Sequence, residues 1–322
     1  MQSSIADLLA GPWALLPDRL PFVRAALSQK ATPQAKIKAV SRSGAVNGRP
    51  AGTGGIAVLP FYGAAVQRTD AHGEALGLLN LARFTQALRA ALADGAVGGI
   101  VLDVDSPGGS VYGVGELADE IYRARARKPI FAIANSLAAA GAYWIASAAS
   151  EFYVTPGGEV GGIGVHDMHV DLSKGLEKAG IETTLIAAGK YKTEGNPFHP
   201  LGADARAAMQ KRVDAYYRAF VAAVAKHRNV PESTVRNGMG QGRLLCADRA
   251  KRENMVDDVA ALDDVMLRLS QHIGQRTPSP GVARVRTSQR FVGALKNQLK
   301  SKTPHTATSA AARQREIESL AL

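Results

Sequence analysis

The chain has 322 residues, a hydrophobic fraction of 46% and a formal net charge of +11, which predict a folded globular protein of one or two domains. Its one cysteine, Cys246, excludes an intramolecular disulfide. No stretch reaches the ~18–20 apolar residues of a membrane-spanning helix, and residues 1–30 lack the pattern of a secretory signal. We therefore expect a cytoplasmic protein that makes no membrane contact.

The positive charge is concentrated at the C-terminal end. Residues 271–322 hold nine Lys and Arg against two Asp and Glu, a net +7, and the preceding part of the chain carries only +4. The segment is also rich in Pro, Ser and Thr, so we predict a basic low-complexity tail. Two interpretations stay open: a tail that contacts nucleic acid or an acidic protein, and a solvated tail with no partner.

Periodic segments divide the rest of the chain. Residues 1–40 carry apolar side chains at helical spacing interrupted by prolines, and predict a helical arm that packs on its own body or on a neighbouring subunit. Residues 41–55, rich in Gly, Ser and Pro, predict a linker. In the domain predicted for 56–270, apolar runs alternate with amphipathic segments, which indicates an α/β fold with a largely parallel sheet. The predicted strands are 56–60, 97–105, 129–134, 152–154, 165–170 and 183–188, and the predicted helices are 76–94, 115–127, 137–149, 172–179 and 203–227.

Three segments that follow predicted strands carry the candidate chemistry. In Asp105-Ser-Pro-Gly-Gly109, the glycines let the backbone approach a ligand and turn N–H groups toward an oxyanion. A helix start made of small residues surrounds Ala140, and its N–H groups suit a developing negative charge. Lys192 lies in a glycine-flanked loop, and a lysine amine serves as a general base once it is neutral. Taken singly, each segment has an ordinary alternative: a turn, a core helix and a surface lysine.

Together and in this order, the three segments resemble a known family. D-S-P-G-G, N-S-L-A-A-x-x-A-Y-W-I-A-S-A-A and G-K-Y-K-T-E-G-N-P-F are similar to motifs of the signal peptide peptidase A type of serine–lysine peptidase, above all its phage prohead or capsid-assembly branch. Gly11–Pro17 and Leu244–Asp257 resemble further segments of that branch, although Asn254 stands where the family usually has glycine. The resemblance implies a crotonase/Clp-protease-like spiral of repeated β-β-α units, and a homo-oligomer.

The resemblance also implies the site. The family's nucleophilic serine falls on Ala140, its lysine base on Lys192, and its oxyanion hole on the backbone N–H groups of Gly108, Gly109 and Gly141. It implies no cofactor and no metal. Because alanine has no hydroxyl group, the chain as written is expected to be inactive, since losing a nucleophile costs ~10⁶-fold in turnover. Either a serine was replaced to trap a precursor or complex, or the chain is a natural pseudoenzyme; the intact lysine and glycine turn favour the first.

Two neighbouring serines are not expected to replace the missing nucleophile. Ser136 is predicted to be the N-cap of the helix, and Ser147 to lie in the core. The small side chains around Ala140 predict a small apolar pocket, which suits a small or aliphatic residue before the scissile bond.

The leading hypothesis is an endopeptidase that processes scaffold and capsid proteins during phage head maturation, in the host cytoplasm or inside the procapsid, with a scaffold-like tail. The alternatives are a non-catalytic oligomeric assembly protein and a cytoplasmic signal-peptide-peptidase-like protease. A crotonase-type acyl-CoA enzyme comes last, because it leaves the lysine loop unexplained.

Overall fold

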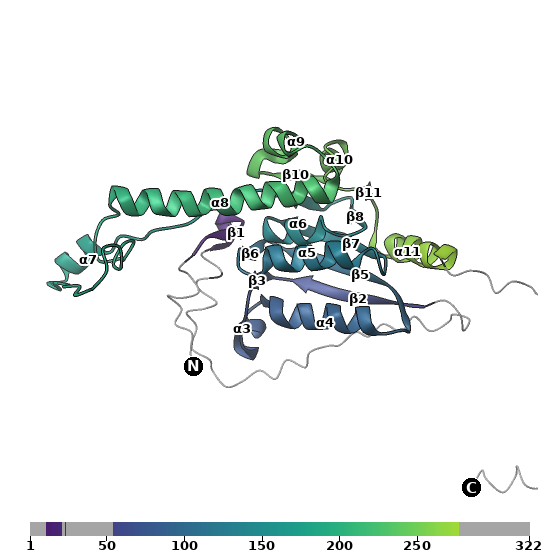
Figure 1. Ribbon diagram of the computed structural model, residues 1–322, viewed down its shortest axis with the longest axis horizontal. Coiled ribbons are helices and arrows are strands. Elements are labelled where there is room, and N and C mark those ends of the chain that lie inside the picture. Colours follow the sequence, from purple (N-terminus) through teal and green to yellow (C-terminus); the bar gives the residue numbers. More distant parts are fainter. Residues whose placement is uncertain (1–10, 21–22, 24–53, 277–322) are drawn as a thin grey trace, which may run out of the picture. The chain divides into compact units, whose positions relative to one another are not determined.

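The computed structural model describes residues 11–20, 23 and 54–276 (Figure 1). The predicted linker 41–55 lies outside the described residues except for its last two, and so do most of the predicted arm 1–40 and most of the predicted tail 271–322. The part of the arm that is described packs on the body as strand β1 (Trp13–Leu15) followed by a short 3-10 helix, η1 (Pro17–Arg19), so the predicted helical character is met only in part. Pro12 and Pro17 flank this strand, and its backbone pairs with two other segments.

A seven-stranded sheet forms the centre of the body. Its strands lie in the order β10 (Leu244–Cys246), β9 (Glu159–Gly161), β7 (Ile130–Ala139), β5 (Val97–Ser106) and β2 (Gly55–Tyr62), with β8 (Glu151–Val154) paired to β7 and β11 (Asp258–Val259) paired to β8. All of these pairings are parallel except that of β10 with β9. The central strands are continuous apolar runs because helices cover a parallel sheet. The predicted α/β fold class is confirmed.

A second, four-stranded sheet lies at the ends of these strands. It contains β1, β6 (Gly108–Ser110), β3 (Ala64–Val66) and β4 (Leu78–Asn80), in that order. The sequence β5, β6, α5 (Val114–Ala124) forms a strand–strand–helix unit, which matches the predicted β-β-α repeat. The preceding unit runs β2, β3, β4 and α4 (Leu81–Ala93) and has one further strand. The short helix α3 (Ala71–Ala75) precedes β4.

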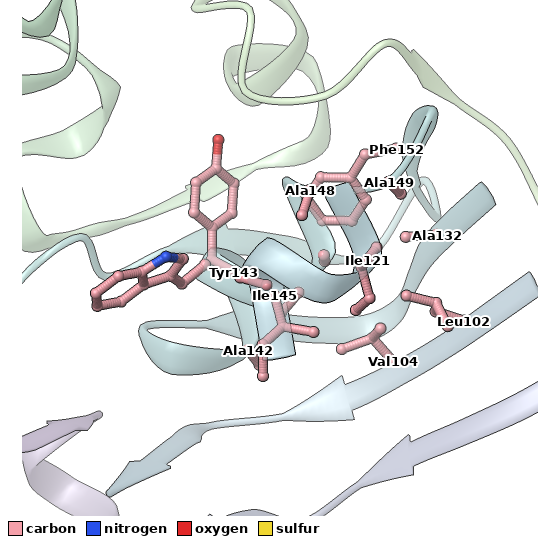
Figure 2. Close-up of a cluster of buried hydrophobic side chains, with 14 of the residues drawn as sticks. Leu102, Val104, Ile121, Ala132, Ala142, Tyr143, Ile145, Ala148, Ala149 and Phe152 are labelled. Atoms are coloured by element: carbon pink, nitrogen blue, oxygen red, sulfur yellow. The ribbon is translucent and has the colours of Figure 1, made fainter. Parts of the chain in front are cut away.

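The core is built around α6 (Gly141–Ala146), every residue of which is buried. Figure 2 shows Ile145 of this helix among Val104 of β5 and Ile121 of α5. On the other side of α6, Trp144 stacks on Phe220 with ring centroids 4.6 Å apart. Phe220 belongs to α8 (Ala203–Arg228), which confirms the predicted helix 203–227. Each large apolar side chain buried in this way contributes ~1.5–3 kcal/mol, so α6 is held rigidly.

The predicted helix 137–149 begins later than expected. Residues 137–139 are the last part of β7, because they pair with Glu159–Gly161 of β9. The N-cap of α6 is Ala140, so the prediction that Ser136 caps the helix is wrong. Ser136 lies in β7, and its hydroxyl donates a hydrogen bond to Asp105 Oδ1 at 2.5 Å. The prediction that Ser147 lies in the core is correct.

The segment 164–204 differs most from expectation. Its predicted helix is present as α7 (Ser173–Lys178), but the predicted strand 183–188 is not formed, and 165–170 contributes only an isolated bridge at His166. No residue from 164 to 204, all of them described, is buried. A strand needs a neighbouring strand or a packed face, and residues 183–188 pair with no strand among the described residues.

The chain after α8 completes the body with α9 (Glu232–Asn237), α10 (Ala247–Arg252) and α11 (Leu262–Arg276). The last of these helices runs past the predicted domain boundary at residue 270. Among the helices in the described ranges, none is both long and apolar enough to cross a bilayer.

Candidate active site

The chain turns sharply from β7 into α6 at Ala140. This residue has φ 50° and ψ −116°, a conformation that residues with a Cβ rarely adopt. Such strain costs ~1–3 kcal/mol, persists only where the surroundings enforce it, and clusters at functional sites. A strained strand-to-helix turn is also how α/β-hydrolases present their nucleophile. Ala140 is therefore placed where a reactive side chain would be held, although it is only 2% exposed.

A glycine loop supports this turn. The Ala140 N–H donates to Gly161 O at 2.7 Å, and the Trp144 N–H donates to Ala140 O at 3.0 Å, which starts the helix. Gly162 has φ 67°, and a Cβ built on it would lie 3.1 Å from the Ala140 nitrogen. The sequence analysis did not include these two glycines in the site, although the glycine density of 157–164 was a signal that could have identified them.

The Asp105–Gly109 segment lies against the same turn. A Cβ built on Gly108 would lie 3.0 Å from both Ala139 O and Ala140 Cβ, so glycine is required there. Ser106 is fully buried and organises the segment: its hydroxyl donates to Gly63 O at 2.7 Å and accepts the Gly108 N–H at 3.2 Å. The sequence analysis did not single out Ser106, although a small polar residue directly after a buried strand was a usable signal.

The four predicted site residues other than Lys192 all lie around one point. Gly108 and Gly109 form the start of β6, Gly141 opens α6, and Ala140 stands between them. The Gly108 N–H is already bonded to Ser106 Oγ. Gly141 is the first residue of α6, where the N–H has no intrahelical acceptor. The Gly108 N–H is therefore less available to a further acceptor than the N–H of Gly141.

Lys192 lies in an exposed loop. The residue is exposed, and its backbone N–H donates to Gly189 O at 3.1 Å within the loop. The described contacts include none between Lys192 and Ala140. Figure 1 shows α7, in the same segment, beyond the N-terminal end of α8 and away from α6. The pairing of the Lys192 amine with Ala140 therefore stays a prediction, because the loop that carries the lysine is exposed.

The immediate surroundings of Ala140 are apolar. Ala14 and Val111 pack with it in one buried cluster, and Val165 and Tyr216 lie against that cluster. Burial raises the pKa of Tyr216, so its hydroxyl stays neutral near pH 7. An environment of this kind strengthens any charge stabilisation by nearby N–H groups, because little water competes.

A second serine, Ser147, contacts a histidine away from this turn. Its hydroxyl lies 3.0 Å from His227 Nδ1, and both residues are buried. Burial lowers the pKa of His227 to about 4, and the ring stacks on Tyr122 with centroids 5.1 Å apart. Because the pair lies closed inside the core, it serves the packing of α8. Within the described ranges, no group of three or more His, Cys, Asp and Glu side chains is arranged to hold a metal.

Comparison with known proteins defines the class. Residues 123–276 match the model of Peptidase family S49. The match covers β7, the Ala140 turn, the glycine loop, Lys192 and α8. This part of the chain is therefore similar to Peptidase family S49.

Individual relatives are similar to this chain over part of their length. The chain is 40% identical over 181 residues to the head-tail preconnector protein GP5 of Enterobacteria phage P21, and 39% identical over 181 residues to the capsid assembly protease C of Escherichia phage lambda. Each match covers 56% of this chain, but only 36% and 41% of the respective relative. A putative signal peptide peptidase SppA of Enterococcus faecium is 29% identical over 188 residues, which cover 58% of this chain and 54% of the relative. Among solved structures, a membrane-bound stomatin-specific protease aligns with a TM-score of 0.45 and 13% identity, covering 71% of this chain and 93% of that one.

Proposed function

We propose that this chain is the body of a Ser–Lys peptidase in which Ala140 occupies the nucleophile position and leaves the chain as written inactive. The observation that supports this most is the strained turn at Ala140, which the Gly161 and Gly162 backbone and the Gly108 turn surround. An alanine gains nothing from this conformation. A hydroxyl group at the same Cβ would be held rigidly between two sets of backbone N–H groups.

The chemistry of a serine form follows from this placement. The hydroxyl oxygen attacks a peptide carbonyl carbon while a neutral amine takes its proton. The N–H groups of Gly109 and Gly141 stabilise the tetrahedral oxyanion, each contributing ~3–4 kcal/mol. The amine then gives the proton to the leaving nitrogen, and water hydrolyses the acyl-enzyme in the same way. No histidine is required.

We propose that the amine is Lys192 of a neighbouring copy of the chain. The segment 164–204 exposes a set of large apolar side chains: Met168, Val170, Leu172, Ile181, Leu185, Ile186 and Tyr191. Exposed apolar surface of this kind marks a protein contact. Apart from Ala205, the buried residues of α8 all lie in its C-terminal half, so its N-terminal half also has room for a partner. A homo-oligomer would bury this surface and could bring the lysine to the Ala140 turn.

The proposed substrates are scaffold and capsid proteins of a phage head, as the names of the P21 and lambda relatives suggest. The proposed place of action is the host cytoplasm or the interior of a procapsid. The basic segment 271–322 suits such a role, because a charged extension could carry the enzyme into an assembling shell.

The test is the Ala140→Ser variant, incubated with the scaffold and capsid proteins that accompany it. Turnover should rise by ~10⁶-fold over the chain as written. Ala140→Gly is the matched control, because it changes the same position without adding a hydroxyl group. A folded Ala140→Ser variant that cleaves neither these proteins nor itself would refute the proposal.

A second candidate is a non-catalytic assembly protein that uses the same fold as a rigid oligomeric body. The alanine itself favours it. In that case Ala140→Ser leaves every measurable property unchanged, and head assembly proceeds equally with either residue.

A further inference from the structure

Strand β1 occupies the position of a bound peptide beside the Ala140 turn. On one side it pairs antiparallel with β6, in the register Trp13 to Ser110, Ala14 to Gly109 and Leu15 to Gly108. On the other side the Trp13 N–H donates to His166 O at 2.7 Å, and the His166 N–H donates to Trp13 O at 3.0 Å. A short extended segment held between two backbone edges is how a peptide binds by strand addition.

The register places one carbonyl group at the proposed oxyanion donors. The Val111 N–H donates to Pro12 O at 3.4 Å, and the Leu16 N–H donates to Pro107 O at 3.0 Å. Because hydrogen-bonded pairs alternate along an antiparallel ladder, Ala14 and Gly109 are the hydrogen-bonded pair between these two, so the Gly109 N–H faces Ala14 O.

The space around the glycines gives the same position for that oxygen. A Cβ built on Gly108 would overlap Ala14 O, and a Cβ built on Gly141 would lie 3.3 Å from it. The Ala14 carbonyl oxygen therefore lies between the two glycine segments, as the carbonyl of a bound substrate would.

The Ala14 side chain also fits the expected pocket. It is fully buried and packs in one cluster with Ala140 and Val111, beside the half-buried Val165 and Tyr216. This cluster has room for a methyl group and for little more. The sequence analysis predicted a small or aliphatic residue before the scissile bond, and Ala14 is such a residue.

We propose that β1 is an intramolecular substrate, and that the peptide bond between Ala14 and Leu15 is a self-processing site of the serine form. This rests on the proposed function. The introduced hydroxyl oxygen bonds to the Ala14 carbonyl carbon, its proton passes through the base to the Leu15 nitrogen, and the bond between that carbon and nitrogen breaks. Water then hydrolyses the ester, releasing residues 1–14 and regenerating the hydroxyl. In the chain as written the bond stays intact, and β1 keeps other peptides out of the cleft.

The first experiment determines the N-terminus of full-length Ala140→Ser by intact mass and N-terminal sequencing. The expected product begins at Leu15. Adding Ala14→Arg should reduce this cleavage by at least ~100-fold, because a long charged side chain does not fit beside Ala140. Adding Asp18→Ala, at an exposed position of the same segment, should leave it unchanged. If Ala140→Ser cleaves added scaffold protein but keeps its own N-terminus, or is cut at another bond, this inference is wrong. The proposed function is not contradicted by that result.

A second measurement does not depend on catalysis. It measures the binding of a fluorescent peptide, which has the sequence of Gly11–Pro17, to two chains. One is the chain as written, and the other is its Ala14→Arg variant. The peptide should bind at least 10-fold more tightly to Ala14→Arg, whose own strand is displaced, and circular dichroism should show that both chains are folded. Equal binding to the two folded chains contradicts the claim that β1 fills the cleft, whatever the serine form does.

Discussion

The Ala140 turn and the Lys192 segment carry equal weight in the family resemblance, but the structure treats them in opposite ways. Every residue of α6 is buried, and Ala140 is 2% exposed. Between 164 and 204 nothing is buried, and Ile186 is 97% exposed. The first region is positioned by the packing of its own chain, whereas the second touches the body mainly at Val165, His166 and Asp167. This contrast is the reason why we propose that a neighbouring copy of the chain supplies the lysine.

The largest expected effect concerns the lysine. In the Ala140→Ser background, Lys192→Ala should lower kcat/KM by about 10³-fold, because a general base contributes ~10²–10⁴-fold. Lys190→Ala is the control from the same loop and should stay within a few-fold of Ala140→Ser. An equal loss of kcat/KM in both variants would mean that the loop acts through its positive charge. It would contradict the specific role proposed for Lys192.

The buried His227 gives the stability of the body a pH dependence. Because burial lowers the pKa of His227 to about 4, the unfolded chain binds a proton more readily than the folded chain between pH 6.5 and pH 4. The free energy of unfolding should therefore fall by up to about 3 kcal/mol as the pH drops through this range. In His227→Gln this decline should flatten, whereas His199→Gln, in the exposed segment, should keep it. Urea titrations at a series of pH values measure the slopes.

A smaller effect is expected at the glycine loop. Gly162→Ala places a methyl group 3.1 Å from the Ala140 nitrogen and puts alanine at φ 67°. The strain should lower the free energy of unfolding by about 1–3 kcal/mol. Gly175→Ala, in α7, has open space around the added Cβ and should not be destabilised. Thermal unfolding distinguishes them, and equal melting temperatures would show that the Ala140 turn is less constrained than its geometry implies.

The smallest effect on stability is expected in the segment itself. Ile186→Ser should change the free energy of unfolding of the isolated chain by no more than ±0.5 kcal/mol, because the side chain is 97% exposed. The same change should weaken self-association, measured by analytical ultracentrifugation. An unchanged association constant would remove Ile186 from the proposed interface.

The buried body could be predicted from the sequence more accurately than the exposed segment 164–204. Long apolar runs such as 97–105 and the amphipathic 203–227 were predicted correctly, because burial on one chain's own core leaves a clear pattern. Residues 137–139 were mistaken for helix, since small apolar residues suit either state and only pairing with β9 decides between them. The strand predicted at 183–188 failed because its pattern has no partner within the chain. The motifs identified the glycines around Ala140, but a motif carries no information about which copy of a chain supplies Lys192.

Co-expression of two differently tagged chains tests the central claim most directly. One is the chain as written, which has Lys192 but no serine, and the other is Ala140→Ser with Lys192→Ala. If the site is completed by a neighbouring copy, the mixed oligomer should cleave scaffold protein at a rate well above that of either chain alone. If the mixed oligomer is as inactive as its parts while Ala140→Ser alone is active, the lysine comes from the same chain, and the division of the site between two copies is wrong.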